Sequence, residues 1–196
     1  MARVAEQAER HEDMVEFLKK VLDQKGGDIN ADERNLVSVA FKNLIQSKRA
    51  AVRTISAIEQ NPQYAKFAEA LAGYKQRVQD LLYADCENIV EIVKTKVIAK
   101  PVEGEAKAFF AKMVGDFWRY VAESATGAKL EQAKSGASEG YALALSDSSL
   151  PACNPTKLGL ALNYSVFQYE VLQNPKEAIE TADQALQAAL EKIDEL

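Results

Sequence analysis

Residues 35–53 read NLVSVAFKNLIQSKRAAVR and combine apolar positions at helical spacing with aligned cations. An α-helix turns by roughly 100° per residue, so Lys42, Arg49 and Arg53 fall within about 40° of one another. Residues such as Phe41 give the same helix other faces that can pack into a core. The stretch therefore predicts a rigid helix with one cationic stripe, which suits an anion site. The alternative is a solvated face, the commoner use of Lys and Arg.

The composition of the 196 residues is typical of a globular protein made of long helices. Apolar residues account for 47% and charged residues for 27%, while only 9 Gly and 5 Pro interrupt the chain. No segment alternates with period two for long enough to predict a strand, so the predicted fold class is all-α. The net charge of −5 argues against a general nucleic-acid binder. A basic stripe on an acidic chain points instead to a local anionic ligand.

The sequence lacks the residue sets of a metal centre, a disulfide framework or a membrane span. Its cysteines are Cys86 and Cys153 and its one histidine is His11, so we expect neither a metal nor a cofactor. No run reaches the roughly 18 apolar residues of a membrane span, and the N-terminus has no apolar signal-peptide core. No G-x-S-x-G, P-loop or H-E-x-x-H motif occurs. We therefore expect a reduced, cytoplasmic protein that is not an enzyme.

Helix-breaking residues divide the chain into a series of predicted helices. Asn30 is followed three residues later by Glu33, which predicts a capping box, and Asn61-Pro62 predicts the end of that helix. Gly127 predicts the end of a later helix. The predicted helices cover residues 2–22 as one or two short helices, 31–60, 63–100, 104–126, 129–146, 155–172 and 178–193.

Two of these helices carry polar groups among apolar ones. We expect 155–172, apolar on nearly every face, to be the most buried helix, and 129–146, which is less apolar, to be peripheral. Within 155–172, Asn163 and Glu170 share one face at i and i+7. If this face, the cationic stripe and the charged face of the helix over 104–126 converge, they form a groove suited to an extended phosphorylated peptide.

The aromatic-rich helix around Trp118 is predicted to be an inner helix, yet it carries a charged seam. Lys112, Asp116, Arg119 and Glu123 stand at i, i+4, i+7 and i+11, on one line of the helix. Charges that lose water must be paired or must serve a ligand. The seam is therefore either part of a ligand site or an internal salt-bridge ladder that joins residues four apart.

The segments NLVSVAFKN, KRAAVRTISAIEQ, KMVGDFWRYVAE and LGLALNYSVFQYE, with AEQAER near the start, resemble the hallmark segments of the 14-3-3 family. The resemblance covers essentially the whole chain. It implies one domain over residues 1–196, an antiparallel bundle of about eight helices shaped as a cup with an amphipathic groove. It also implies a homodimer, with residues 1–62 and 63–100 as the dimerisation region. Its implied function is that of an adaptor that binds phosphoserine or phosphothreonine peptides of client proteins in signalling.

Carried over residue by residue, the resemblance assigns functions to particular side chains. The family's phosphate-binding positions fall on Lys42, Arg49, Arg119 and Tyr120. Its peptide-groove positions fall on Lys112, Gly159, Leu162, Asn163, Val166 and Glu170. Arg53 and Glu123 match supporting charges, expected to form an ion pair rather than to touch the peptide.

The resemblance also implies which residues meet in the dimer. Small, apolar or aromatic residues match the interface at Val4, Ala8, Ala51, Ile55, Ile58 and Tyr74. Asp13 and Arg77 match an ion pair between subunits. Arg10 belongs to the same interface, but the family's acidic partner falls on Leu81, with Asp80 one residue earlier. We therefore expect a weaker dimer than is usual for the family.

The family continues beyond the position of Leu196 into one more helix, which completes the apolar wall of the groove, and the family's first helix is longer. If the protein itself lacks that last helix, we expect weaker peptide binding and an exposed apolar patch over the last two helices. A tetratricopeptide-like scaffold that binds partners independently of phosphate is the alternative. Residues 174–182, NPKEAIETA, resemble a helix of such repeats, but no 34-residue period recurs.

Overall fold

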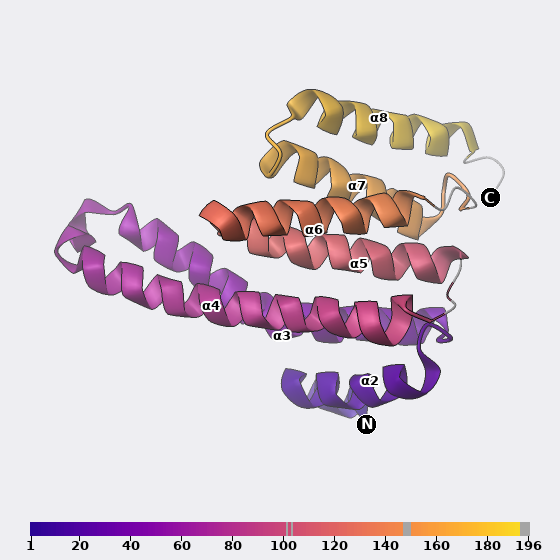
Figure 1. The fold of residues 1–196 in the computed structure, drawn as a ribbon, viewed down its shortest axis with the longest axis horizontal. Helices are drawn as coiled ribbons and strands as arrows, with labels where there is room; N and C mark the ends of the chain where they lie inside the picture. The colour runs from indigo at the N-terminus through magenta and orange to yellow at the C-terminus, as the bar shows by residue number, and fades with distance from the viewer. Residues whose placement is uncertain (101, 103, 147–149, 193–196) are drawn as a thin grey trace. The chain divides into compact units, whose positions relative to one another are not determined.

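The computed structural model describes residues 1–100, 102, 104–146 and 150–192 (Figure 1). It divides into two compact units, Met1–Ile92 and Val93–Leu196. Every regular element among the described residues is helical, which confirms the all-α prediction. The predicted end of the last helix at Ile193 lies outside the described residues. No helix in the described part of the chain is both long and apolar enough to cross a membrane.

The first unit begins with two short helices and continues with two long ones. Its elements are α1 (Ala2–Gln7), α2 (His11–Lys25), α3 (Ala31–Glu59), the 3₁₀ helix η1 (Pro62–Phe67) and α4 (Ala68–Val93), which runs one residue into the next unit. The end of α3 before Asn61-Pro62 is as predicted. The single helix predicted over 63–100 is wrong, because a 3₁₀ turn opens it and a π-helical turn, η2 (Lys94–Ile98), closes it.

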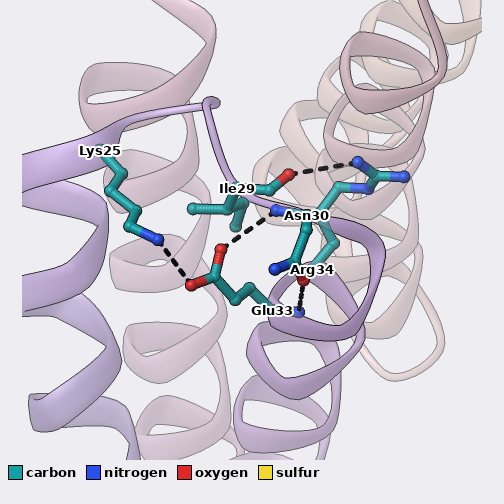
Figure 2. A network of polar contacts seen from close by, with 5 residues as sticks. All are labelled: Lys25, Ile29, Asn30, Glu33 and Arg34. Carbon is teal, nitrogen blue, oxygen red and sulfur yellow. Dashed lines mark hydrogen bonds and ion pairs between the residues drawn. The ribbon is translucent and has the colours of Figure 1, made fainter.

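The predicted capping box is present at the start of α3 (Figure 2). The Asn30 side chain accepts a hydrogen bond from the Glu33 backbone N–H at 2.9 Å, and the Glu33 carboxylate accepts one from the Asn30 N–H at 3.1 Å. Lys25, at the end of α2, lies 2.7 Å from the same carboxylate. These groups satisfy N–H donors that a helix start leaves without partners, so they fix where α3 begins.

Helices α3 and α4 run antiparallel within the first unit. Lys48 on α3 pairs with Asp85 on α4 at 2.8 Å, and Glu59 further along α3 pairs with Lys75 near the start of α4. One face of α3 is packed, since Val37, Ala40, Phe41, Ile45, Val52 and Ile55 are buried. The helix that carries the cationic stripe is thus anchored along its other faces, as the sequence predicts.

Among the described residues of the second unit, four helices follow the π-helical turn. They are α5 (Gly104–Ala122), α6 (Gly127–Leu145), α7 (Pro155–Glu170) and α8 (Pro175–Lys192). Asn154 caps α7 by accepting from the N–H groups of Thr156 and Lys157, and Pro155 takes the first helical position, as expected. Gly127 does not end α5 as predicted: α5 ends at Ala122, and Gly127, with a positive φ of 55°, starts α6.

Helices α5 and α6 form the centre of this unit, which corrects two predictions about burial. Helix α5 is buried at nearly every position from Phe110 onward, whereas α7 is buried at only a few. Helix α6 is not peripheral, because its small residues let it lie directly against α5. A Cβ atom on Gly140 would stand 2.5 Å from the Gly115 backbone nitrogen, and one on Gly136 would stand 2.6 Å from the Trp118 ring. Low hydrophobicity in α6 therefore reflects close packing rather than exposure.

Candidate functional site

The first unit supplies the cationic stripe. Lys42, Arg49 and Arg53 lie on α3, with Lys42 and Arg53 exposed and Arg49 half-buried. All three stand on one line of a helix whose opposite face is packed, so their backbone positions are fixed. The burial pattern agrees with the stripe that the sequence predicts.

The second unit contains a polar network centred on Asp116, whose side chain is almost fully buried at 2% exposure. One carboxylate oxygen, Oδ1, accepts hydrogen bonds from the Tyr141 hydroxyl at 2.8 Å and from the Asn163 Nδ2 at 2.7 Å. The other, Oδ2, pairs with Lys112 Nζ at 2.7 Å. Asp116 and Lys112 come from α5, Tyr141 from α6 and Asn163 from α7. Three helices are thus joined through one carboxylate.

Arg119 extends this network one turn further along α5. Its Nε donates to the Tyr141 hydroxyl oxygen at 3.3 Å, and its terminal nitrogen pairs with Glu123 at 3.2 Å. The guanidinium carbon lies 4.7 Å from the centre of the Tyr120 ring, within the range of a cation–π contact. Arg119 is only 8% exposed, so it is a buried cation held by several neighbours.

Burial and charge act together on the ionisable groups of the network. Burial and the nearby Asp116 carboxylate raise the pKa of Tyr141 far above its ordinary value, so its hydroxyl remains protonated. Burial acts to lower the pKa of Arg119, but Tyr141, Tyr120 and Asp116 outweigh it and the net direction is upward. The hydroxyl is therefore a permanent donor to Asp116, and the guanidinium is permanently charged.

The salt-bridge ladder predicted along α5 is confirmed. Lys112 pairs with Asp116 and Arg119 pairs with Glu123, each four residues apart. The ladder does not exclude a ligand site, because the same side chains also reach Tyr141 on another helix. Tyr141 is the member that the sequence analysis missed. Its only local signal is the pair Gly136 and Gly140 just before it, which permits α6 to approach α5 closely.

The predicted groove residues of the second unit fall into two groups. Near the network, a Cβ atom on Gly159 would stand 3.6 Å from the Lys112 side chain, so Gly159 on α7 faces Lys112, and Asn163 follows one turn later. Val166 and Glu170 instead line a shallow hollow between α7 and α8, of about 230 Å³. Leu162 is exposed.

The exposed apolar surface expected over the last two helices is present. Large side chains that are at least 39% exposed follow α7, the turn after it and α8: Leu162, Tyr169, Leu172, Ile179, Leu186 and Leu190. Tyr169 and Ile179 both line the hollow between the two helices. This surface is called the α7–α8 apolar face below.

The residues predicted for the dimer differ in how accessible they are within one chain. Val4 and Tyr74 are 58% and 51% exposed, and Ala8 is exposed as well. Ala51 and Ile58 are half-buried, while Ile55 is buried inside its own unit at 5% exposure. Ile55 therefore has little surface left to offer a second subunit.

The charged residues predicted at that interface already interact within the chain. Arg10 donates a hydrogen bond from Nε to Asp13, three residues later. This contact raises the pKa of Arg10 and lowers the pKa of Asp13. Arg10 thus has an acidic partner within its own chain, Asp13, although the position of the family's acidic partner is occupied by Leu81. The Arg77 guanidinium lies 5.9 Å from the Tyr74 ring centre.

In the described part of the chain, no group of three or more His, Cys, Asp or Glu side chains is arranged to hold a metal ion. Cys86 is buried, and Cys153 donates a weak hydrogen bond to the Ala189 carbonyl oxygen at 3.2 Å. The network described above consists of cations, carboxylates, an amide and a hydroxyl, and its cations and amide are groups that can bind anions and peptide groups.

Comparison with known proteins places this geometry in a family. The model of the 14-3-3 protein family matches residues 1–196. The chain is 40% identical to a 14-3-3-like protein of Pisum sativum over 202 residues, which cover 100% of this chain and 78% of that protein. It is 39% identical to 14-3-3 protein 6 of Solanum lycopersicum over 203 residues, with 100% and 79% covered. For 14-3-3-like protein C of Nicotiana tabacum the identity is 39%, with 100% and 78% covered.

A match over the whole length at this identity is far beyond what shared helical composition produces. It agrees with the all-helical structure. The chain belongs to the 14-3-3 family.

Proposed function

We propose that this protein is an adaptor that binds phosphoserine- or phosphothreonine-containing segments of client proteins and performs no catalysis. Membership of the 14-3-3 family is the observation that carries the proposal. It is supported by the second unit, where Arg119 is a buried, permanently charged cation fixed by neighbouring side chains. None of the relatives' names denotes an enzyme.

The proposal assigns the phosphoryl group to Lys42, Arg49, Arg119 and Tyr120. A phosphoryl group carries about −1.5 to −2 charges at neutral pH and offers three acceptor oxygens. Arginine guanidinium groups can hold such oxygens in pairs, lysine adds a point charge and tyrosine adds a neutral donor. Each hydrogen bond to a charged group contributes roughly 1.5–3 kcal/mol. Several together separate a phosphorylated client from an unphosphorylated one by orders of magnitude.

The cations proposed for the site suit a dianion by their charge type. They are Lys42, Arg49, Arg53, Lys112 and Arg119, of which the last two pair with Asp116 and Glu123 within the second unit. A phosphoryl group brings the charge of about −1.5 to −2 that such cations attract. A glutamate placed in the client as a mimic carries about half that charge and has no tetrahedral oxygens, so it should bind poorly.

The remaining groove residues are assigned to the client's backbone and side chains. Asn163 offers an amide that can pair with a peptide bond, and Gly159 lies beside Lys112. Leu162 and Val166 supply apolar surface, and Glu170 supplies a carboxylate. We further propose that the protein acts as a homodimer in the cytoplasm. Its partners are phosphorylated proteins rather than nucleic acids or membranes.

Fluorescence anisotropy of a labelled peptide containing Arg-Ser-x-pSer-x-Pro tests the function directly. We expect binding by the native protein, no measurable binding of the unphosphorylated peptide, and a loss of at least about tenfold in affinity for Arg49→Ala. Lys20→Ala on the exposed side of α2 is the matched control, because it also removes one positive charge. It should leave the affinity unchanged.

A folded protein that binds both peptides equally would contradict the proposal and would favour a phosphate-independent helical scaffold. Equal losses in Arg49→Ala and Lys20→Ala would show that only net charge matters, which would also contradict the assigned site. Circular dichroism of each variant checks that its helix content is unchanged.

A further inference from the structure

The Tyr141 hydroxyl occupies a central place in the network of the second unit. It accepts a hydrogen bond from Arg119 Nε and donates one to Asp116 Oδ1, the same oxygen that accepts from Asn163. A continuous chain of hydrogen bonds therefore runs from the guanidinium of α5 through α6 and back to α5, and ends at the amide of α7. Tyr141 itself is fully buried, at 0% exposure, so it cannot touch a client.

The carboxylate of Asp116 also determines how the Asn163 amide is oriented. An ionised carboxylate only accepts hydrogen bonds, so it selects the NH₂ end of the amide and turns the carbonyl oxygen away. Asn163 remains half-buried rather than covered. Its carbonyl oxygen is thereby left to accept a backbone N–H, and its second N–H to donate to a backbone carbonyl.

We propose that Asp116 and Tyr141 are positioning residues that couple the phosphate-binding Arg119 to the peptide-binding Asn163. This proposal rests on the proposed function for the roles of Arg119 and Asn163. The two side chains bind different parts of one client, the phosphoryl group and the backbone. Holding both through one carboxylate and one hydroxyl means that a client finds them already in register and does not have to order them.

No other side chain of similar shape can perform the task of Tyr141. Phenylalanine would fill the same space beside Gly115 but would neither accept from Arg119 nor donate to Asp116. Burial and the Asp116 charge keep the pKa of Tyr141 high, so the hydroxyl retains its proton at neutral pH. The link is therefore not lost by titration of Tyr141 near neutral pH.

Tyr141→Phe tests the coupling, with Tyr164→Phe as the matched control. Tyr164 packs against Tyr141, with ring centres 5.5 Å apart, but its hydroxyl is not a member of the network. We expect Tyr141→Phe to weaken phosphopeptide binding roughly three- to tenfold and Tyr164→Phe to leave it unchanged. Both are measured well below the unfolding temperature, so that a loss of stability alone does not change the affinity.

A double-mutant cycle with Asn163→Ala separates positioning from a general structural role. If Tyr141 acts through Asn163, then Tyr141→Phe should cost clearly less in the Asn163→Ala background than in the native one. Additive losses would overturn the coupling. Equal affinities of the native protein and Tyr141→Phe would overturn it as well.

Nitrogen-15 NMR of the protein without any peptide examines the network independently of the proposed function. The Nε–H signal of Arg119 should exchange slowly in the native protein and rapidly in Tyr141→Phe. Asp116→Asn should shift the side-chain NH₂ signals of Asn163, since an amide can replace the carboxylate only by offering its own oxygen. Unchanged signals in both variants would refute the network.

Native protein that shows these signals but binds no phosphopeptide would refute the proposed function instead, and with it the roles in binding assigned to Asp116 and Tyr141.

Discussion

Gly140 marks the closest approach of α5 and α6. A Cβ atom there would meet three backbone atoms, with the nearest, the Gly115 nitrogen, at 2.5 Å. Backbone cannot move aside as the end of a flexible side chain can, so Gly140→Ala must push the two helices apart. We expect it to lower the free energy of unfolding by about 1–3 kcal/mol, measured by urea denaturation.

Gly73, in the exposed part of α4, is the control for this substitution. A Cβ atom on Gly73 would meet no atom within 4 Å, and the residue lies inside a helix. Alanine there should stabilise by about 0.5–1 kcal/mol, because it reduces the freedom of the unfolded chain. If Gly140→Ala proves as harmless as Gly73→Ala, the close contact between α5 and α6 is not as described.

Two separable interactions stabilise the start of α3, the cap formed by Asn30 and the ion pair of Glu33 with Lys25. Asn30→Ala removes the acceptor for the Glu33 N–H and should cost about 0.5–2 kcal/mol in unfolding free energy. Glu33→Gln keeps an oxygen for the Asn30 N–H but removes the charge that faces Lys25. Thermal unfolding of both variants beside the native protein distinguishes these contributions.

The charge effect at Glu33 has a definite pH dependence. The hydrogen bonds from Lys25 and then from the Asn30 N–H lower the pKa of Glu33 below its ordinary value of 4.5. A carboxyl whose pKa is lower in the folded state stabilises above its unfolded pKa, and that stability is lost as the pH falls through the folded value. The native protein should therefore exceed Glu33→Gln in stability at neutral pH, and the difference should disappear in acid. A difference that grows on acidification would contradict this sign.

For the molecule as a whole, the homodimer implied by family membership can be tested by sedimentation equilibrium. Tyr74 is half-exposed in one chain, and a carboxylate there would be buried without a partner on association. We expect the native protein to sediment as a dimer and Tyr74→Glu as a monomer. Ile179 lies on the α7–α8 apolar face and is 61% exposed. Ile179→Glu adds the same charge there, and this variant should remain a dimer.

A native protein that sediments as a monomer at every concentration would contradict the dimer. Dissociation by Ile179→Glu but not by Tyr74→Glu would move the interface to the α7–α8 apolar face. In that case the ion pair of Arg10 with Asp13 would face solvent and would not lie in the dimer interface.

Features that depend on neighbours in sequence were predictable from the sequence. The capping box at Asn30, the Asn154 cap that starts α7 and the ladder of α5 all join residues within four positions of one another. Helical geometry alone brings such residues together, so spacing is enough to predict them. The cationic stripe on α3 follows from the same periodicity.

The burial of α6 and the centre of the candidate site were decided by tertiary structure. Tyr141 and Asn163 reach Asp116 from positions 25 and 47 residues away, and α6 is buried because glycines replace the apolar side chains that usually signal a core helix. The sequence by itself determined the family, most of the helices and the candidate charges. Only the packing of α5, α6 and α7 decided which of these charged and polar side chains share a hydrogen bond. A difference of a few tenths of an ångström between donor and acceptor decides whether a hydrogen bond forms, and no local sequence pattern encodes such a difference.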